Sequence, residues 1–117
     1  MSDKNKLIDF SGLSEMLYDE EDYIKEFAEA ALDSFSQFSE DYAKYLKVRD
    51  EENFRKAGHK IKPVVKMLSL DPILDEYEHA KTLLWDNEPD AKLEESIQKM
   101  ESLCDRVITE LNEKIDN

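Results

Sequence analysis

Apolar residues recur every three or four positions along most of this chain, which is the period of an amphipathic α-helix. The pattern predicts long helices over residues 20–47 and 89–115, and shorter ones over residues 51–69 and 71–86. The apolar stripe of the first long helix consists of Ile24, Phe27, Ala28, Ala31, Leu32, Phe35, Phe38, Tyr42, Tyr45 and Leu46. The stripe of the last helix consists of Leu93, Ile97, Met100, Leu103, Cys104, Val107, Ile108 and Leu111.

Short polar breaks separate the predicted helices. Residues 48–50 form a tight connection, in which Asp50 is a suitable N-cap for the next helix. Asp71 and Pro72 mark another start, with the aspartate as N-cap and the proline at the first helical position. Residues 87–89 interrupt the chain once more before the last helix. Such short connections make consecutive helices antiparallel neighbours.

We therefore expect an all-α fold, an antiparallel four-helix bundle with a short additional N-terminal helix. The extra helix is predicted over residues 9–17, with Asp9 or Ser11 as its cap, after a frayed tail of residues 1–7. A chain of 117 residues is enough for one hydrophobic core, so residues 1–117 are expected to form a single domain.

Charge and cysteine content narrow the functional classes. The formal net charge of −13 argues against binding to nucleic acid or to an anionic membrane surface, because both need positive potential. Cys104 is the single cysteine, which is typical of a reducing compartment. No apolar stretch is long enough to span a bilayer. We expect a cytoplasmic, monomeric protein with no cofactor and no metal.

Residues 54–68 are exceptional in this acidic chain because they carry a row of basic residues. On a helix, their apolar residues form one stripe, and Lys56, His59, Lys62 and Lys66 fall on the opposite, solvent-facing side. A histidine surrounded by lysines on an exposed helix face is a suitable environment for a phosphoryl group, whose negative charge the lysines would balance.

Residues 58–63 read Gly-His-Lys-Ile-Lys-Pro, and this motif resembles that of histidine-containing phosphotransfer (HPt) domains. The family motif has a small residue, the histidine, a lysine three positions later and then usually a glycine. The resemblance extends over roughly residues 8–111. It implies that His59 accepts a phosphoryl group and that Lys62 stabilises it, while Gly58 serves helix packing. Pro63 departs from the pattern by replacing the usual glycine.

By this resemblance, the protein is a phosphoryl carrier and not an enzyme. Its partners would be receiver domains of response regulators or of a hybrid sensor kinase, which bring the aspartate, the Mg²⁺ and the catalysis. The sequence contains no Gly-rich phosphate loop and no ATP-site motif. Docking would use residues around His59, for which we name Lys56, Lys60, Pro63, Lys66, Met16, Ile24 and Met67. Lys56 and Lys66 would act mainly through their long-range field.

Two other interpretations remain open at this stage. The chain could be a helical adaptor that binds a receiver or kinase without accepting phosphate. Independently, Pro63 could either tilt the helical turn that carries His59 or select particular partners through its bulk. Alternatively, Glu76 and His79 have the Glu-x-x-His spacing of di-iron bundles, but such sites need a second copy and two further glutamates. The simpler interpretation of His79 is an ordinary surface residue.

Overall fold

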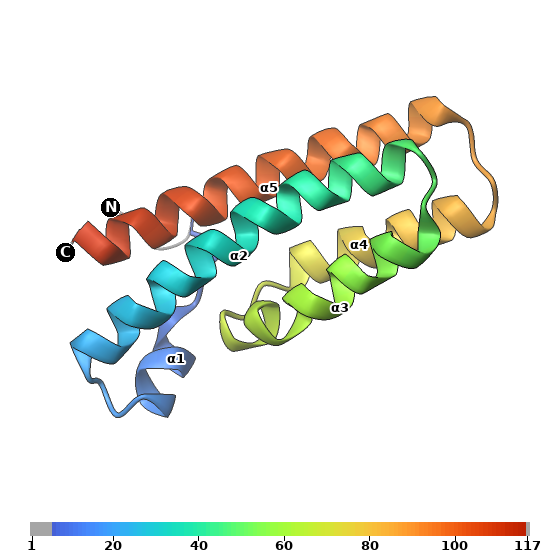
Figure 1. Cartoon of the computed structure of the whole chain (residues 1–117). Helices are drawn as coiled ribbons and strands as arrows, with labels where there is room; N and C mark the ends of the chain where they lie inside the picture. The colour runs from blue at the N-terminus through green and yellow to red at the C-terminus, as the bar shows by residue number, and fades with distance from the viewer. Residues whose placement is uncertain (1–5, 117) are drawn as a thin grey trace.

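The all-α fold predicted from the periodicity is confirmed. The computed structural model describes residues 6–116, and within them it contains five helices: α1 (Phe10–Met16), α2 (Glu21–Lys47), α3 (Glu51–Met67), α4 (Asp71–Trp85) and α5 (Asp90–Asp116). The four longer helices pack as a bundle, in which α2 contacts α5 and α3, and α4 contacts the same two helices. Figure 1 shows α1 beside the first turns of α2.

The bundle has two layers of unequal length. Helices α2 and α5 have 27 residues each and lie side by side, whereas α3 and α4 form a shorter hairpin of 17 and 15 residues. The hairpin covers the end of the α2–α5 pair that carries the two connecting loops, and α1 lies toward the other end (Figure 1). The result is an elongated molecule of 46 × 28 × 19 Å.

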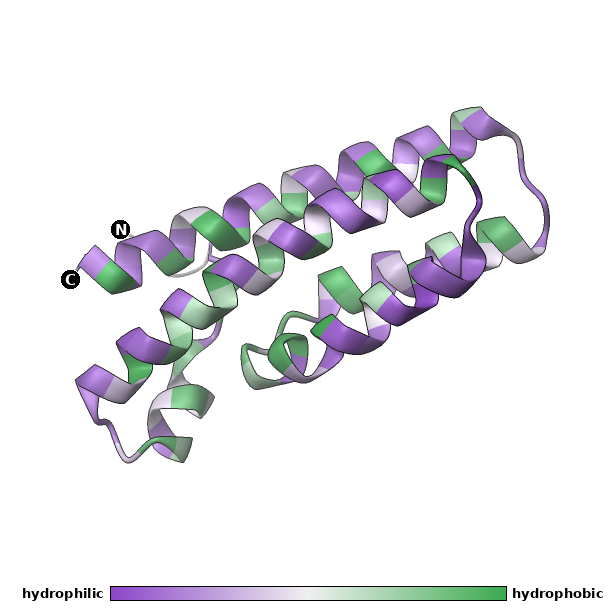
Figure 2. Ribbon diagram, viewed as in Figure 1, coloured by the Kyte–Doolittle hydropathy of each residue, from purple (hydrophilic) through white to green (hydrophobic). Residues whose placement is uncertain are grey.

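The core lies between the helices and follows the predicted stripes closely. In Figure 2, hydrophobic and hydrophilic residues alternate along each helix, as expected when one face is buried and the other is exposed to solvent. Of the predicted α2 stripe, Phe27, Leu32 and Tyr45 are only half-buried. Cys104 is fully buried, as predicted, and this burial raises the pKa of its thiol to about 12.

Aspartates cap two of the helices, as the sequence predicts. Oδ1 of Asp50 accepts the backbone N–H of Asn53 at 3.2 Å, and Oδ1 of Asp9 accepts that of Ser11 at 3.0 Å. The side chains of Asn53 and Ser11 donate to the same carboxylates, and these side-chain hydrogen bonds, together with the backbone ones, lower the pKa of both aspartates. Helix α3 ends at Met67 and not at the predicted Ser69, because the chain changes direction at Ser69, where φ is 57°.

The prediction that Asp71 caps α4 is wrong. Leu70 occupies the N-cap position and makes no side-chain cap bond, because its aliphatic side chain has no acceptor; it is fully buried in the core instead. Asp71 therefore lies in the first turn, where its negative charge still interacts favourably with the helix dipole.

A buried polar network fixes α4 against α2 and α5. The hydroxyl of Ser96 donates to Oε2 of Glu76 at 2.7 Å and lies 2.7 Å from the hydroxyl of Tyr42, which also donates to the backbone carbonyl of Glu76 at 3.2 Å. Lys99 completes the network with an ion pair of 3.3 Å to Oε1 of Glu76. Tyr42, Glu76 and Ser96 are buried, and because each has a partner, none of them is left with an unsatisfied hydrogen bond, while Lys99 is exposed at the edge of the network.

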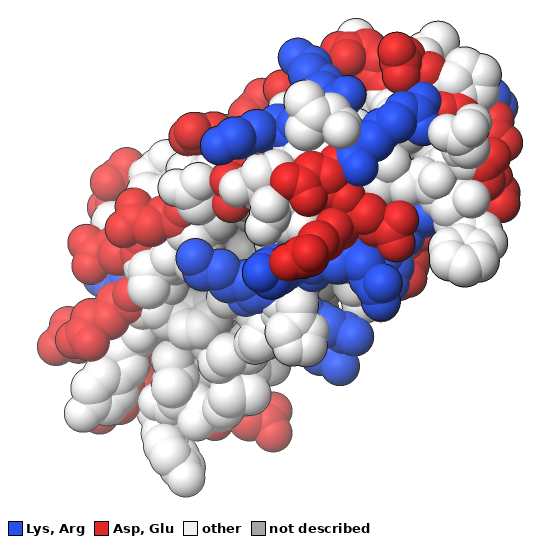
Figure 3. Space-filling model, turned by 45° about the vertical axis from the view of Figure 1, so that its right-hand side comes forward, with Lys and Arg blue, Asp and Glu red and all other residues white. Residues whose placement is uncertain are grey.

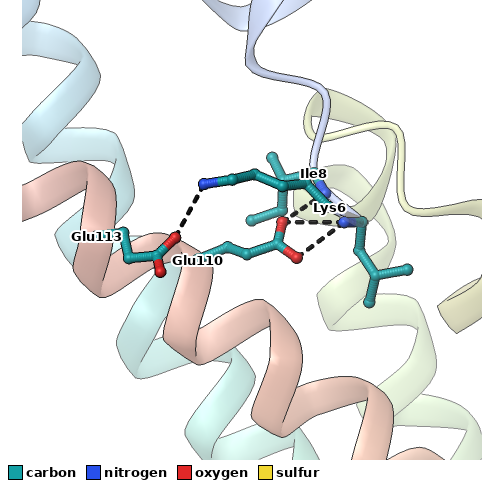
Figure 4. A network of polar contacts seen from close by, with 5 residues as sticks. Lys6, Ile8, Glu110 and Glu113 are labelled. Atoms are coloured by element: carbon teal, nitrogen blue, oxygen red, sulfur yellow. Dashed lines mark hydrogen bonds and ion pairs between the residues drawn. The ribbon is translucent and has the colours of Figure 1, made fainter. Parts of the chain in front are cut away.

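The start of the described chain is held against α5. The carboxylate of Glu110 accepts the backbone N–H groups of Leu7, at 2.8 and 3.0 Å, and of Ile8, at 2.8 Å (Figure 4). Lys6 forms an ion pair of 2.9 Å with Glu113. The predicted frayed tail is thus wrong for Lys6 and Leu7, and the rest of it, residues 1–5, lies outside the described residues. The backbone of Leu7 and Ile8 is held by Glu110 of α5, a contact that helix periodicity does not predict.

Within residues 6–116, none of the helices combines the length and the apolar character that a membrane span requires.

Replacing Glu110 by Gln should lower the free energy of unfolding by about 1–3 kcal/mol, because both carboxylate oxygens accept backbone N–H groups and the NH₂ group of glutamine can only donate. Urea denaturation followed by circular dichroism measures this change. Glu113→Gln is the matched control, since it removes only an exposed ion pair and should change stability by less than about 0.5 kcal/mol. Equal losses in the two variants would contradict the anchoring role of Glu110.

Candidate functional site

The orientation of α3 determines which of its side chains reach solvent. Phe54, Gly58, Ile61 and Val65 are buried and face the core, at the steps expected of one helix face. His59 follows the buried Gly58 directly and is exposed on the outer side. Its surroundings are therefore set by the polar residues one or two turns before and after it.

Gly58 permits α4 to approach α3 closely beside His59. A Cβ atom at position 58 would overlap the ring of Tyr77 and would lie 2.5 Å from its hydroxyl oxygen. The Tyr77 hydroxyl donates to the backbone carbonyl of Arg55 at 3.3 Å, and the ring packs 5.2 Å from that of Phe54, centroid to centroid. Burial raises the pKa of Tyr77, so its hydroxyl remains protonated and able to donate. These contacts agree with the packing role predicted for Gly58.

Pro63 lies inside α3, one turn after His59, and the helix continues beyond it to Met67. Proline has no amide hydrogen, so the backbone carbonyl of His59 receives no helix hydrogen bond from position 63. The ring of Pro63 is exposed and adds bulk to the same side of the molecule as the histidine.

A groove of about 850 Å³ lies beside His59, between α3 and α4. Five of its lining residues are cationic and three are glutamates, so it has positive charge in a protein whose net charge is −13. Figure 3 shows lysine and arginine side chains gathered on one face of the molecule, with acidic side chains beside them. The lining consists of Glu51, Glu52, Arg55, Lys56, Gly58, His59, Lys60, Lys62, Tyr77, Glu78 and Lys81.

The cations of this face differ in whether they have carboxylate partners. On the side toward the helix N-terminus, Arg55 pairs with Glu51 at 3.8 Å and Lys56 pairs with Glu52 at 3.3 Å. Across the groove, Lys81 pairs with Glu78 at 3.1 Å, and its Nζ lies 5.3 Å from the centroid of the Tyr77 ring.

Beyond His59 along α3, the lysines are not neutralised. Lys60, Lys62 and Lys66 are exposed, and none of them forms an ion pair with a carboxylate in the described part of the chain. Lys62 is three residues from His59 and therefore its neighbour on the helix surface. The positive potential at the histidine is thus strongest on the side of Lys62.

Lys60 borders two hollows. Besides the groove beside His59, it lines a second one of about 280 Å³ between α2 and α3, together with Asp33, Gln37 and Asp41. Lys60 directly follows His59 and is therefore about 100° from it around the helix, which brings it toward α2 as well.

The remaining predicted docking residues differ in exposure. Met16 has 56% of its surface exposed, and Met67 is half-buried against the core. Ile24 is only 1% exposed, so its prediction as a docking residue is wrong: its side chain fills the core between α2 and its neighbours. Tyr18 and Tyr23 are exposed at the α1–α2 end instead, and neither belongs to the predicted apolar stripe of α2.

Trp85, the last residue of α4, is a large apolar side chain beside the groove. Its surface is 82% exposed, and it lines a hollow of about 300 Å³ with Thr82 and with four residues that also line the groove, Glu51, Arg55, Glu78 and Lys81. The hollow therefore extends the groove toward the end of α4.

Glu76 and His79 line the same hollow of about 320 Å³, but the carboxylate of Glu76 already has other partners. Glu76 directs its carboxylate to Ser96 and Lys99, as described above, whereas His79 is exposed. Among residues 6–116, no group of three or more His, Cys, Asp or Glu side chains is arranged to hold a metal ion.

Arg55, Tyr77 and Lys81 were not among the predicted site residues. Arg55 could have been found, because it precedes His59 by four residues and so shares its helix face. Tyr77 and Lys81 could not, since their place beside His59 depends on how closely α4 packs against α3.

Comparisons with protein-family models, with curated proteins and with solved structures found no match to this chain. The functional argument therefore rests on the residues around His59 and on their arrangement.

Replacing Gly58 by Ala should lower the free energy of unfolding by about 1–3 kcal/mol, because the added methyl group overlaps the Tyr77 ring and forces α4 outward. Gly12→Ala is the matched control. A Cβ atom at position 12 would meet nothing within 4 Å, so alanine should leave stability unchanged or raise it by up to about 1 kcal/mol through helix propensity. Urea denaturation compares the two, and a gain in stability for both variants would rule out the close approach.

Proposed function

We propose that this protein is a histidine phosphotransfer protein of a two-component phosphorelay. It accepts a phosphoryl group from a receiver-domain aspartate on His59 and transfers it to a second receiver. The observation that carries the proposal is the exposed His59 in the middle of α3 of a strongly acidic chain. It is flanked by Lys62 and by further lysines that have no carboxylate partner within the described part of the chain.

The chemistry asks little of this chain beyond a neutral, accessible imidazole. A ring nitrogen of His59 attacks the phosphorus of the acyl phosphate, a P–N bond forms, and the P–O bond to the aspartate breaks to return its carboxylate. Lys62 then forms a charge-assisted hydrogen bond with the phosphoryl oxygens. The partner brings the Mg²⁺ that balances charge during the transfer. The chain is accordingly a carrier and not an enzyme.

Charge also supports a receiver domain as the partner. A phosphorylated aspartate and its acidic surroundings are attracted by the lysines beyond His59, which steers the encounter and fixes its orientation. The predicted docking residues that are exposed on the helix of the histidine are Lys56, Lys60, Pro63 and Lys66, while Met67 is half-buried on the same helix and Met16 is exposed on α1.

A non-phosphorylated adaptor is the second candidate. The observation in its favour is Pro63, whose exposed ring adds bulk one turn from His59 and narrows the approach of a partner. Such an adaptor binds a receiver or kinase through the same face without taking up phosphate.

Incubation with a phosphorylated receiver domain and Mg²⁺ should transfer label to the wild-type protein, and the label should be acid-labile and alkali-stable. His59→Gln should abolish this transfer, whereas His79→Gln, the matched control, should leave it unchanged. Lys62→Gln should slow the transfer roughly tenfold, the effect of one lost charge-assisted hydrogen bond. Gel electrophoresis after acid and alkali treatment measures all four proteins.

Label on His59→Gln would place the acceptor elsewhere and contradict the proposal. Receivers that bind the wild-type protein but never label it would favour the adaptor. In that case Pro63→Gly, which restores the usual family residue, tests whether the proline ring is the obstacle.

A further inference from the structure

Arg55 lies in the groove beside His59 and has no role in the proposal above. The two residues are four apart on α3, so their Cβ atoms are helix-surface neighbours at about 5–6 Å. Both line the groove between α3 and α4. A guanidinium group at this distance can reach a phosphoryl group on the imidazole from the side opposite Lys62 along the helix.

The backbone of Arg55 is fixed while its side chain is loosely held. The Tyr77 hydroxyl anchors the carbonyl of Arg55 to α4. The guanidinium pairs with Glu51 at 3.8 Å, and both side chains are about half exposed or more, at 63% and 47%. An exposed pair of this length holds its partners weakly. A doubly negative phosphoryl group competes easily with a single carboxylate for the same cation.

Helix geometry distinguishes Arg55 from the other cations. Successive residues are about 100° apart around the axis, so Arg55 and Lys62 fall on the same side of His59 as Gly58, the residue in contact with Tyr77. Lys56 also lines the groove but falls on the other side of the histidine, where it pairs with Glu52. Lys66 lies two turns away and does not line the groove.

We propose that the phosphoryl group carried by His59 is bound in the groove between α3 and α4, between Lys62 and Arg55, and that Arg55 exchanges Glu51 for the phosphoryl oxygens. This inference rests on the proposed function. The planar guanidinium offers two parallel N–H donors to a phosphoryl group, which a lysine cannot do. Lys81, on the opposite wall of the groove, is paired with Glu78 and held over the Tyr77 ring, so it is less free than Arg55 to bind the phosphoryl group.

Phosphoramidate provides a test that needs no protein partner. The P–N bond of this donor breaks as a P–N bond to the His59 ring forms, and the proton lost from the ring leaves with the ammonia as ammonium. The ³¹P chemical shift of the product, followed against pH, gives the pKa for the second ionisation of the phosphoryl group. This pKa is about 6 without neighbours, and each cation in contact lowers it.

In Arg55→Gln, the pKa of the phosphoryl group should rise by about one unit above its wild-type value, because an opposite charge in contact is lost. Arg55→Lys should give an intermediate value, since it keeps the charge but not the paired donors. Glu51→Gln should lower the pKa, because it frees Arg55 from its carboxylate. Lys66→Gln is the control: it removes one charge from the same helix face outside the groove and should shift the pKa by less than a third as much.

Equal shifts in Arg55→Gln and Lys66→Gln, or no shift in Arg55→Gln, would overturn the inference while His59 remains the acceptor. A wild-type protein that takes no phosphoryl group on His59 would overturn the proposed function and this inference with it. The urea midpoint of each variant must equal that of the wild type, because a shift caused by misfolding would appear there. An altered pKa with an unaltered midpoint supports direct contact.

Discussion

The contact between the ring of Tyr77 and the backbone at Gly58 is the constraint on which the site depends. It fixes the distance between α3 and α4, and hence the width of the groove beside His59. The hydroxyl of Tyr77 also donates a hydrogen bond to the backbone carbonyl of Arg55, and the ammonium group of Lys81 lies over the face of its ring. A residue with a side chain at position 58 would separate the two helices, and the groove would lose one wall. Packing and electrostatics are therefore set together by a single aromatic side chain.

Charge is distributed so that a local positive field survives in a strongly acidic protein. Toward the start of α3, glutamates one turn away neutralise Arg55 and Lys56, whereas the lysines after His59 have no such partners among residues 6–116. Arg55 and Lys56 must leave a glutamate before they can bind another anion, whereas the lysines after His59 can bind one directly. This gradient along one helix gives the histidine a preferred side for an anion, which neither the net charge nor the number of lysines would indicate.

The sequence predicted the helices, the caps Asp9 and Asp50 and the outward face of His59, because each depends on neighbours within a few residues. It failed where long-range packing decides. Ile24 belongs to a regular stripe, and only the assembled core shows that it is covered completely. Leu7 is held by Glu110, a partner more than one hundred positions away. The groove likewise combines residues of two helices, so its shape could not be read from either one.

The position of Trp85 has a practical consequence for spectroscopy. It is the single tryptophan of the chain, and its indole is largely in contact with water in the folded protein. Unfolding would change its environment little, so its fluorescence is a poor reporter of stability. It is, however, next to Arg55 and Lys81 at the end of the groove. The fluorescence of Trp85 should change when a ligand or a partner covers that end. Binding to the groove can therefore be followed in the unmodified protein, without an added label.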